Sequence, residues 1–172
     1  MIKCMDMTLA THIIIAAAVT KSIAPAHPLL IFTTAIITHY LSDAIPHWDY
    51  SLSSIDSEVR HEERKWNFRD PTFLRDIRNI AFDAFLGTAL VALIASPASS
   101  SEFLWLFLTA AGAVLPDFLQ GVYFTRRADF LRVIHHFHGF MHSKIALGPY
   151  PLIGIPFQAI IFLTAFASLL GN

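Results

Sequence analysis

Long apolar stretches alternate with shorter polar ones along the whole chain. Six of the apolar stretches have the length and pattern of helices, and prolines or polar clusters separate them. No strand pattern with a period of two competes with the helical one. The sequence therefore predicts an all-α protein, with helices at about 8–21, 29–44, 71–96, 100–124, 129–144 and 152–170.

Two of these helices have local signals at their first residues. Asp70 and Pro71 fit the N-cap and the first helical position of the third helix. Ser99 and Glu102 have the spacing of a capping box before the fourth helix. We therefore expect both helices to begin at these signals.

The apolar surface of the helices exceeds what one small soluble core usually buries. Mean hydropathy is +0.54 and charged residues make up 15% of the chain, against roughly 25% in an ordinary soluble domain. Residues 152–170 contain no charge, and 71–96 is long enough to cross a bilayer. We expect one integral membrane helical bundle over residues 1–172, with five spanning helices and 129–144 as an amphipathic surface helix. A buried helical core in a soluble protein is the alternative, because the first two helices are short and Pro156 interrupts the last.

Charge is divided unevenly between the two sides of this predicted bundle. The polar loop 45–70 and the His-rich segment 125–150 share one side with the N-terminus, and every Lys and Arg except Lys21 lies on that side. The positive-inside rule then predicts a cytoplasmic N-terminus.

The net charge of −1 indicates no general attraction to nucleic acid. Cys4 is the only cysteine, which excludes an internal disulfide and a cysteine zinc cluster.

Ionisable side chains interrupt several of the apolar helices. Such groups are costly in lipid and mark candidate functional sites. His39 and Asp43 lie four residues apart on one helix face, and Pro46 turns the chain so that His47 can fold back toward them. A lone histidine in such a helix is also typical of helix packing, and a lone carboxylate is typical of a structural hydrogen bond. These alternatives apply to His12 and Asp83, and Asp117 is a further candidate next to Pro116.

The segment HHFHGFMHS, residues 135–143, has four histidines within two turns of helix. His135, His138 and His142 fall within about 60° around the helix axis, and His136 points elsewhere. Imidazoles and carboxylates without thiolates suit one or more divalent ions, with Zn²⁺ favoured and Mn²⁺ or Fe²⁺ as alternatives. Bis-histidine haem ligation competes with this interpretation but leaves the aspartates unexplained. The predicted metal ligands are His12, His39, Asp43, His47, Asp117, His138 and His142.

These motifs resemble those of small membrane proteins described as predicted membrane-bound metal-dependent hydrolases, some of them LexA-regulated. The counterparts here are His12 after a short N-terminus, SDAIPHWD after the second helix, and GFMHS at 139–143. The helix-borne H-x-x-x-D spacing is more distantly similar to zinc-dependent phospholipase C.

The sequence departs from the resembled family in two motifs. The first histidine of the family's H-R-G-x-x-H-S run falls at Phe137, so that either His136 or His138 takes its place. The family's P-D-x-D-H motif is represented by Asp43, with His47 displaced.

The resemblance implies hydrolysis in a prokaryotic cytoplasmic membrane without identifying the substrate. A metal with an open coordination position lowers the pKa of bound water toward about 7. A site at the boundary of the lipid bilayer suggests a phosphoester or lipid-like substrate. Asp83 is the candidate bridging ligand or base, and Asp117 is the second candidate catalytic carboxylate. A non-catalytic membrane protein that binds or transports a metal, or relays protons, is the alternative.

Overall fold

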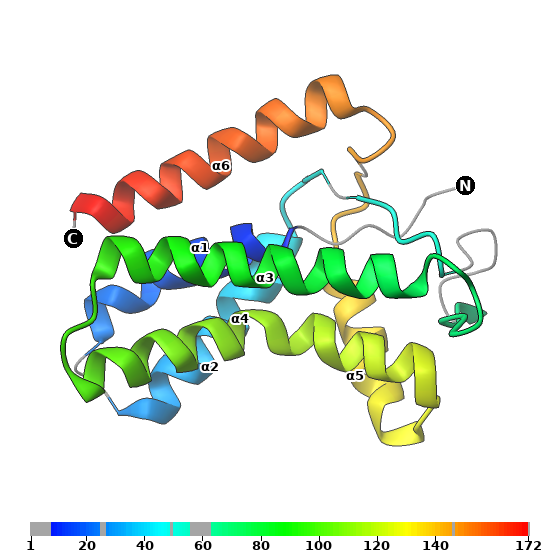
Figure 1. Ribbon diagram of the computed structural model, residues 1–172, viewed down its shortest axis with the longest axis horizontal. Coiled ribbons are helices and arrows are strands. Elements are labelled where there is room, and N and C mark those ends of the chain that lie inside the picture. Colours follow the sequence, from blue (N-terminus) through cyan, green and yellow to red (C-terminus); the bar gives the residue numbers. More distant parts are fainter. Residues whose placement is uncertain (1–7, 25–26, 49, 56–62, 146, 172) are drawn as a thin grey trace.

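The chain forms a helical bundle in the computed structural model, which describes residues 8–24, 27–48, 50–55, 63–145 and 147–171 (Figure 1). Within these residues there is no β-strand, and Ile55 and Trp66 form an isolated bridge. The all-α prediction is therefore confirmed. The helices are α1 (Leu9–Thr20), the short 3-10 helix η1 (Lys21–Ile23), α2 (Pro28–Asp43), α3 (Phe73–Ala95), α4 (Ser100–Arg126), α5 (Asp129–Met141) and α6 (Pro151–Gly171).

One of the two predicted helix starts is confirmed. Ser99 Oγ accepts from the Glu102 N–H at 3.3 Å, and Glu102 Oε2 accepts from the Ser99 N–H at 2.9 Å, which completes a capping box. The predicted start of α3 is wrong, because α3 begins at Phe73 with Thr72 as its N-cap. Asp70 Oδ1 accepts from the Thr72 N–H at 2.8 Å and from its hydroxyl at 2.5 Å, which closes a turn ahead of the helix. The same two bonds lower the pKa of Asp70.

Helix α1 lies at the centre of the bundle. It contacts α2, α3, α4 and α6, and nine of its 12 residues are buried. Two glycines permit close helix crossings in the bundle. A Cβ on Gly87 of α3 would lie 2.6 Å from Ala10 Cα, and a Cβ on Gly112 of α4 would lie 2.7 Å from Phe32 O. Because small residues let helix backbones approach closely, these crossings hold α1 against α3 and α2 against α4.

Three helices are long and apolar enough to cross a membrane, namely α3, α4 and α6, with 23, 27 and 21 residues. Helices α3 and α6 bury only three residues each, and large apolar side chains such as Leu93 and Leu152 are exposed. Helix α1 has 12 residues and α2 has 16. At 1.5 Å per residue these are about 18 and 24 Å long, short of the roughly 30 Å hydrocarbon core. The structure therefore supports three spanning helices, fewer than the five predicted.

The two ends of the bundle differ in charge. One end gathers α5, the α2–α3 and α5–α6 connections and the α4–α5 turn, and the other gathers the α3–α4 turn and the end of α6 (Figure 1). At this second end the described residues include one basic side chain, Lys21, whose Nζ donates to Leu169 O at 2.9 Å. We call the first end the basic end, because its described residues include Arg64, Lys65, Arg69, Arg75, Arg78, Arg126, Arg127, Arg132 and Lys144.

Candidate metal centre

Seven histidine and aspartate side chains converge where α2 ends, and we call them the His/Asp cluster. They come from α1, α2, α4, α5 and the segments that follow α2 and α5. They form three overlapping groups, and in each group one ligand atom per residue lies within 4.8 Å of the others. The cluster brings together all seven residues that were predicted as ligands. The groups are His12, His39 and Asp43; His39, Asp117 and His138; and Asp43, His47 and His142.

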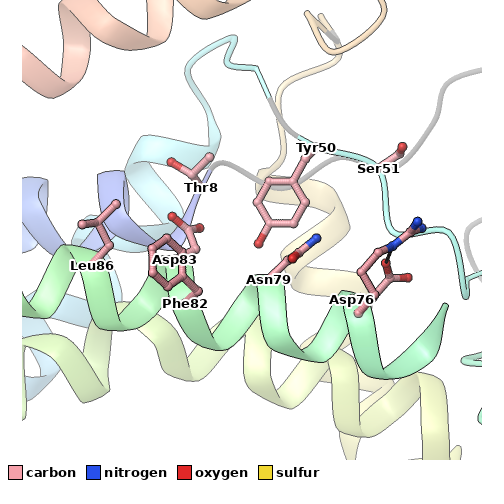
Figure 2. Close-up of a pocket in the computed structure, with 9 residues that line it drawn as sticks. Thr8, Tyr50, Ser51, Asp76, Asn79, Phe82, Asp83 and Leu86 are labelled. Atoms are coloured by element: carbon pink, nitrogen blue, oxygen red, sulfur yellow. Dashed lines mark ion pairs between the residues drawn. The ribbon is translucent and has the colours of Figure 1, made fainter.

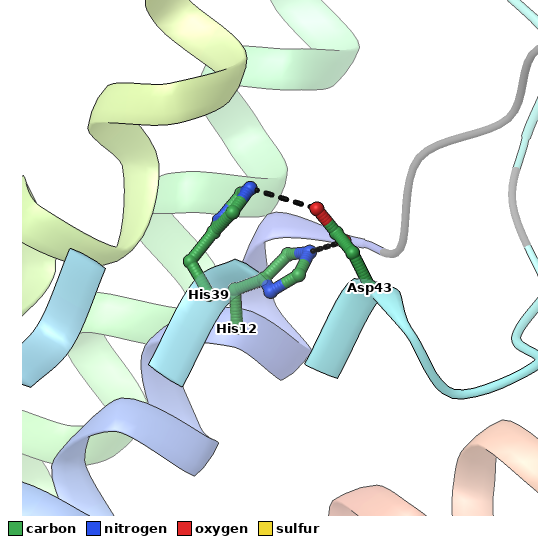
Figure 3. Close-up of side chains that lie close together, drawn as sticks. All are labelled: His12, His39 and Asp43. Atoms are coloured by element: carbon green, nitrogen blue, oxygen red, sulfur yellow. Dashed lines mark ion pairs between the residues drawn. The ribbon is translucent and has the colours of Figure 1, made fainter. Parts of the chain in front are cut away.

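The carboxylate of Asp43 is central to the cluster. Its Oδ1 lies 3.2 Å from His12 Nε2, and Figure 3 shows this pair beside His39. Its Oδ2 lies 3.2 Å from His39 Nε2 and 3.0 Å from His138 Nε2. None of these four side chains is exposed to solvent. His142 Nε2 lies 3.7 Å from the same Oδ2, and this side chain is 15% exposed.

The second ring nitrogen of two cluster histidines is bonded to a backbone carbonyl. His39 Nδ1 lies 2.6 Å from Ala113 O, and His47 Nδ1 lies 2.6 Å from Ile45 O. A carbonyl oxygen only accepts hydrogen bonds, so Nδ1 carries the proton in both rings. In its neutral form each ring therefore keeps the lone pair of Nε2 for the cluster. Metal-binding histidines are commonly oriented in this way.

A hydroxyl fixes His12 in the same orientation. His12 Nδ1 lies 2.9 Å from Ser42 Oγ. The same Oγ lies 3.0 Å from Thr38 O and 2.8 Å from His39 O, so its single hydrogen is used by one of these carbonyls. Ser42 Oγ therefore accepts a hydrogen bond from His12 Nδ1, and the lone pair of His12 Nε2 faces Asp43.

Neutral histidines leave hydrogen-bond acceptors facing other acceptors. The Nε2 atoms of His12 and His39 and both Asp43 oxygens have no hydrogen-bond partner among the described residues. An imidazole lone pair and a carboxylate oxygen repel each other, and a buried carboxylate is costly without compensating charge. A cation among these atoms removes both problems, because each of them can then act as a ligand. The buried His/Asp groups are therefore suited to hold a metal ion.

The distances in the second group also suit a metal ion. Asp117 Oδ1 lies 3.6 Å from His39 Nε2 and 3.5 Å from His138 Nε2. With Asp43 Oδ2 these atoms make four donors, and the four histidine–carboxylate distances among them are between 3.0 and 3.6 Å. Donors 2.0–2.2 Å from one tetrahedral ion lie about 3.3–3.6 Å apart. The four histidine–carboxylate distances are therefore close to those around one ion.

The structure does not bring Asp83 into the His/Asp cluster. Its Oδ2 accepts from the Leu9 N–H at 2.6 Å, and its Oδ1 accepts from the Ala10 N–H at 3.4 Å. These are the free amides at the start of α1, where a negative charge is favourable. Asp83 thus holds the first turn of the helix that carries His12. This contact is the structural hydrogen bond that the sequence left open as the alternative.

An open pocket of about 560 Å³ lies beside this contact (Figure 2). Tyr50, Asn79 and Asp83 line its polar part, and Phe82 and Leu86 line its apolar part. The pocket and the cluster adjoin the same first turn of α1, because Thr8 and His12 are four residues apart.

The other two histidines of α5 have different surroundings. His135 is buried, and its ring stacks on Tyr123 with a centroid distance of 4.4 Å and meets Phe124 edge-on. His136 is exposed, and Arg132 Nε donates to its Nε2 at 3.4 Å. Of His136 and His138, which the sequence left as alternatives, His138 is the one in the cluster.

Sequence reasoning missed the groups that orient the ligands. Ser42 precedes Asp43 directly, but its contact with His12 joins residues 30 positions apart. The Ala113 carbonyl has no sequence signal, because every residue has one. Gly112 beside it was detectable as a glycine within an apolar helix, which often marks a close approach of backbones.

Comparison with known proteins finds no relative of this chain. No protein-family model, no curated protein and no solved structure matches it. The function is therefore inferred from the site.

Proposed function

We propose that the protein is a membrane-bound metal-dependent hydrolase. The observation that carries this proposal is that the buried Nε2 atoms of His12 and His39 each face an oxygen of Asp43 at 3.2 Å without a hydrogen-bond partner among the described residues. The motifs shared with the resembled hydrolase family support the same conclusion. The donor set of imidazole and carboxylate favours Zn²⁺, with Mn²⁺ or Fe²⁺ as alternatives.

A bound divalent ion would supply Lewis-acid activation of a water molecule for attack on an ester. The chain's own residues hold the ion and manage the proton. His39 and His138 approach Asp117 through its Oδ1, and we assign its Oδ2 to take the proton from the attacking water. Asp117 is 14% exposed and His142 is 15% exposed, whereas Asp43 is fully buried. The substrate would therefore approach past Asp117 and His142.

We assign Asp83 a positioning role in this reaction in place of a bridging or basic one. Its two bonds to the first amides of α1 fix the helix that carries His12. Asp83→Asn keeps one acceptor oxygen, which can retain the shorter bond from the Leu9 N–H, so the substitution should preserve activity. Asp117→Asn removes the proton acceptor and should abolish it.

The proposed substrate is a phosphoester or another lipid-like ester at the membrane surface. Apolar side chains face outward on α5, where Phe130, Val133 and Phe140 are more than 70% exposed. The opposite face of the same helix carries His138. An interfacial helix of this kind lies with its apolar face in the lipid, which would bring the cluster to the level of ester groups. The pocket beside α1, with its polar and apolar parts, suits a ligand of the same mixed character.

The membrane orientation that we propose has the basic end of the bundle in the cytoplasm. Of the ten described Lys and Arg residues, nine lie at the basic end and one, Lys21, lies at the opposite end. The positive-inside rule then gives a cytoplasmic N-terminus and a cytoplasm-facing cluster.

Hydrolysis by the purified protein in detergent tests the proposed function. We expect cleavage of a phosphodiester or a phospholipid that a chelator abolishes and that added Zn²⁺ or Mn²⁺ restores. Asp43→Asn should remove this activity, and His136→Gln, an exposed histidine outside the three groups, should retain it. Metal binding without hydrolysis of any ester in a broad panel would favour a metal-binding or metal-transport protein.

A further inference from the structure

The two oxygens of Asp43 face different histidines. Oδ1 faces His12 Nε2 at 3.2 Å. Oδ2 faces His39 Nε2 at 3.2 Å and His138 Nε2 at 3.0 Å, and His142 Nε2 lies farther from it, at 3.7 Å. A carboxylate that binds one ion can present a single oxygen to it. A carboxylate whose two oxygens are each directed at a separate set of imidazoles has the arrangement of a bridge between two ions.

The histidine rings are paired in a way that matches such a bridge. The rings of His12 and His39 stack with their centroids 4.0 Å apart and their planes 20° apart. The rings of His138 and His142 stack in the same manner, at 5.1 Å and 14°. Two parallel rings present two separate lone pairs at about the distance between them. Ions in two-metal hydrolytic sites lie about 3.5–4 Å apart. The His12–His39 pair has this spacing and can supply one ring to each ion, and the His138–His142 pair is wider.

The cluster also has more donors than one ion uses. A tetrahedral ion takes four ligands, and the cluster contains seven donor residues in three groups. Asp117 belongs only to the group with His39 and His138, whereas His47 belongs only to the group with Asp43 and His142. The cluster therefore has separate donors for two positions on either side of Asp43.

We propose that the His/Asp cluster holds two divalent ions bridged by the carboxylate of Asp43. The first ion binds His39, His138, Asp117 and Asp43 Oδ2. The second ion binds His12 and Asp43 Oδ1. His47 and His142, which form one group with Asp43, complete its ligands once the His142 ring turns from Oδ2 toward this ion. This proposal rests on the metal centre of the proposed function and adds a second ion to it.

A second ion changes the charge of the site and hence the class of substrate. Asp43 and Asp117 contribute a charge of −2, which one divalent ion cancels. Two divalent ions leave a net charge of +2 when the histidines are neutral. A buried site of this charge attracts anions strongly, because charges interact more strongly there than in water. The substrate class that follows is a phosphoester anion in preference to a neutral carboxylic ester.

The number of ions bound at saturation tests the second ion directly. The full chain is purified in detergent, stripped with a chelator, equilibrated with Zn²⁺ and then analysed for zinc per chain. We expect two ions in the unsubstituted protein and in His136→Gln, the matched control on α5. Asp117→Asn and the pair His47→Gln with His142→Gln should each retain one ion, because each removes donors of one position only.

The possible counts separate the two proposals. One ion per chain in the unsubstituted protein would overturn the second ion and leave the metal-dependent hydrolase intact. No bound ion would overturn both. Two ions that are lost together in Asp117→Asn would show that the assignment of donors to separate positions is wrong.

Electron paramagnetic resonance of the Mn²⁺-loaded protein gives a second measurement that is independent of activity. Two Mn²⁺ ions that share the Asp43 carboxylate are coupled magnetically, so the spectrum of an isolated Mn²⁺ should be absent at full loading. That isolated spectrum should appear in Asp117→Asn. An isolated-ion spectrum in the fully loaded unsubstituted protein would contradict the bridge.

Discussion

A neutral histidine can bind a metal through one ring nitrogen only when the other ring nitrogen carries the proton. In His12 an acceptor holds that proton on Nδ1, because Ser42 Oγ accepts a hydrogen bond from Nδ1 at 2.9 Å. Without that acceptor the neutral ring can carry its hydrogen on Nε2, where it would block an ion. Removing such partners typically lowers metal affinity by about 10–100-fold.

Ser42→Ala should therefore weaken Zn²⁺ binding by about 10–100-fold without removing any ligand. Competition between the protein and a chromophoric chelator measures the affinity. Thr33→Ala is the matched control on the same helix, because Thr33 Oγ1 donates to Leu29 O at 2.8 Å on the exposed side of α2. Equal affinities in Ser42→Ala and Thr33→Ala would contradict the proposed orienting role of Ser42.

The sequence predicted which residues gather at the site better than it predicted their individual contacts. The cost of an ionisable group in an apolar helix singled out His12, Asp43 and Asp117, and the structure brings them together. Their role as ligands stays a prediction. The same cost singled out Asp83, which instead accepts hydrogen bonds from amides 73 and 74 residues away in sequence. Spacing along one helix contains no information about such distant partners.

At the scale of whole helices, the sequence predicted existence and order well and membrane crossing less well. The capping box at Ser99 was predictable because both of its partners lie within four residues. The start of α3 was not predictable, because Asp70 could either cap the first turn of a helix or close the turn that precedes the helix. The predicted number of spanning helices was too high. The apolar residues of α1 are buried against four other helices, so they did not indicate a membrane span.

The crossing of α2 and α4 sets the distance between ligands on different helices. Helix α2 carries His39 and Asp43, and α4 carries Asp117. Gly112→Ala places a Cβ 2.7 Å from Phe32 O and 2.8 Å from Ala35 Cβ, so the helices must separate. We expect a loss of about 1–3 kcal/mol in the free energy of unfolding.

Zn²⁺ affinity should fall together with stability in Gly112→Ala, because the same crossing sets the site. Unfolding in detergent and chelator competition measure the two quantities. Gly171→Ala at the end of α6 is the matched control, because its Cβ would meet nothing within 4 Å, and it should change stability by less than about 0.5 kcal/mol. A Gly112→Ala protein with unchanged stability and affinity would show that the crossing is looser than the structure indicates.

The whole molecule combines an apolar exterior with a group of buried His and Asp side chains that could hold a metal ion. Helices α3, α4 and α6 can cross a bilayer, and α5 lies at the basic end of the bundle (Figure 1). Phe130 and Phe140 of α5 are exposed. A lipid bilayer around the three long helices would place α5 near one surface. The depth of the His/Asp cluster relative to the bilayer would then depend on where these helices end. No single motif in the sequence specifies that depth.

Membrane sidedness gives a test of this arrangement as a whole. Ala98 lies in the α3–α4 turn at one end of α3, and Lys65 precedes the other end, and both are exposed. If α3 spans the bilayer, single cysteines at these positions must face opposite sides. The positive-inside rule puts Lys65 in the cytoplasm, with the cluster on the same side. In a chain with Cys4→Ser, an impermeant maleimide should label Ala98→Cys in intact cells and Lys65→Cys only after permeabilisation.

Labelling of both positions from one side would show that α3 does not cross the membrane. Labelling of Lys65→Cys alone in intact cells would retain the span and reverse the orientation, so that the cluster would face away from the cytoplasm.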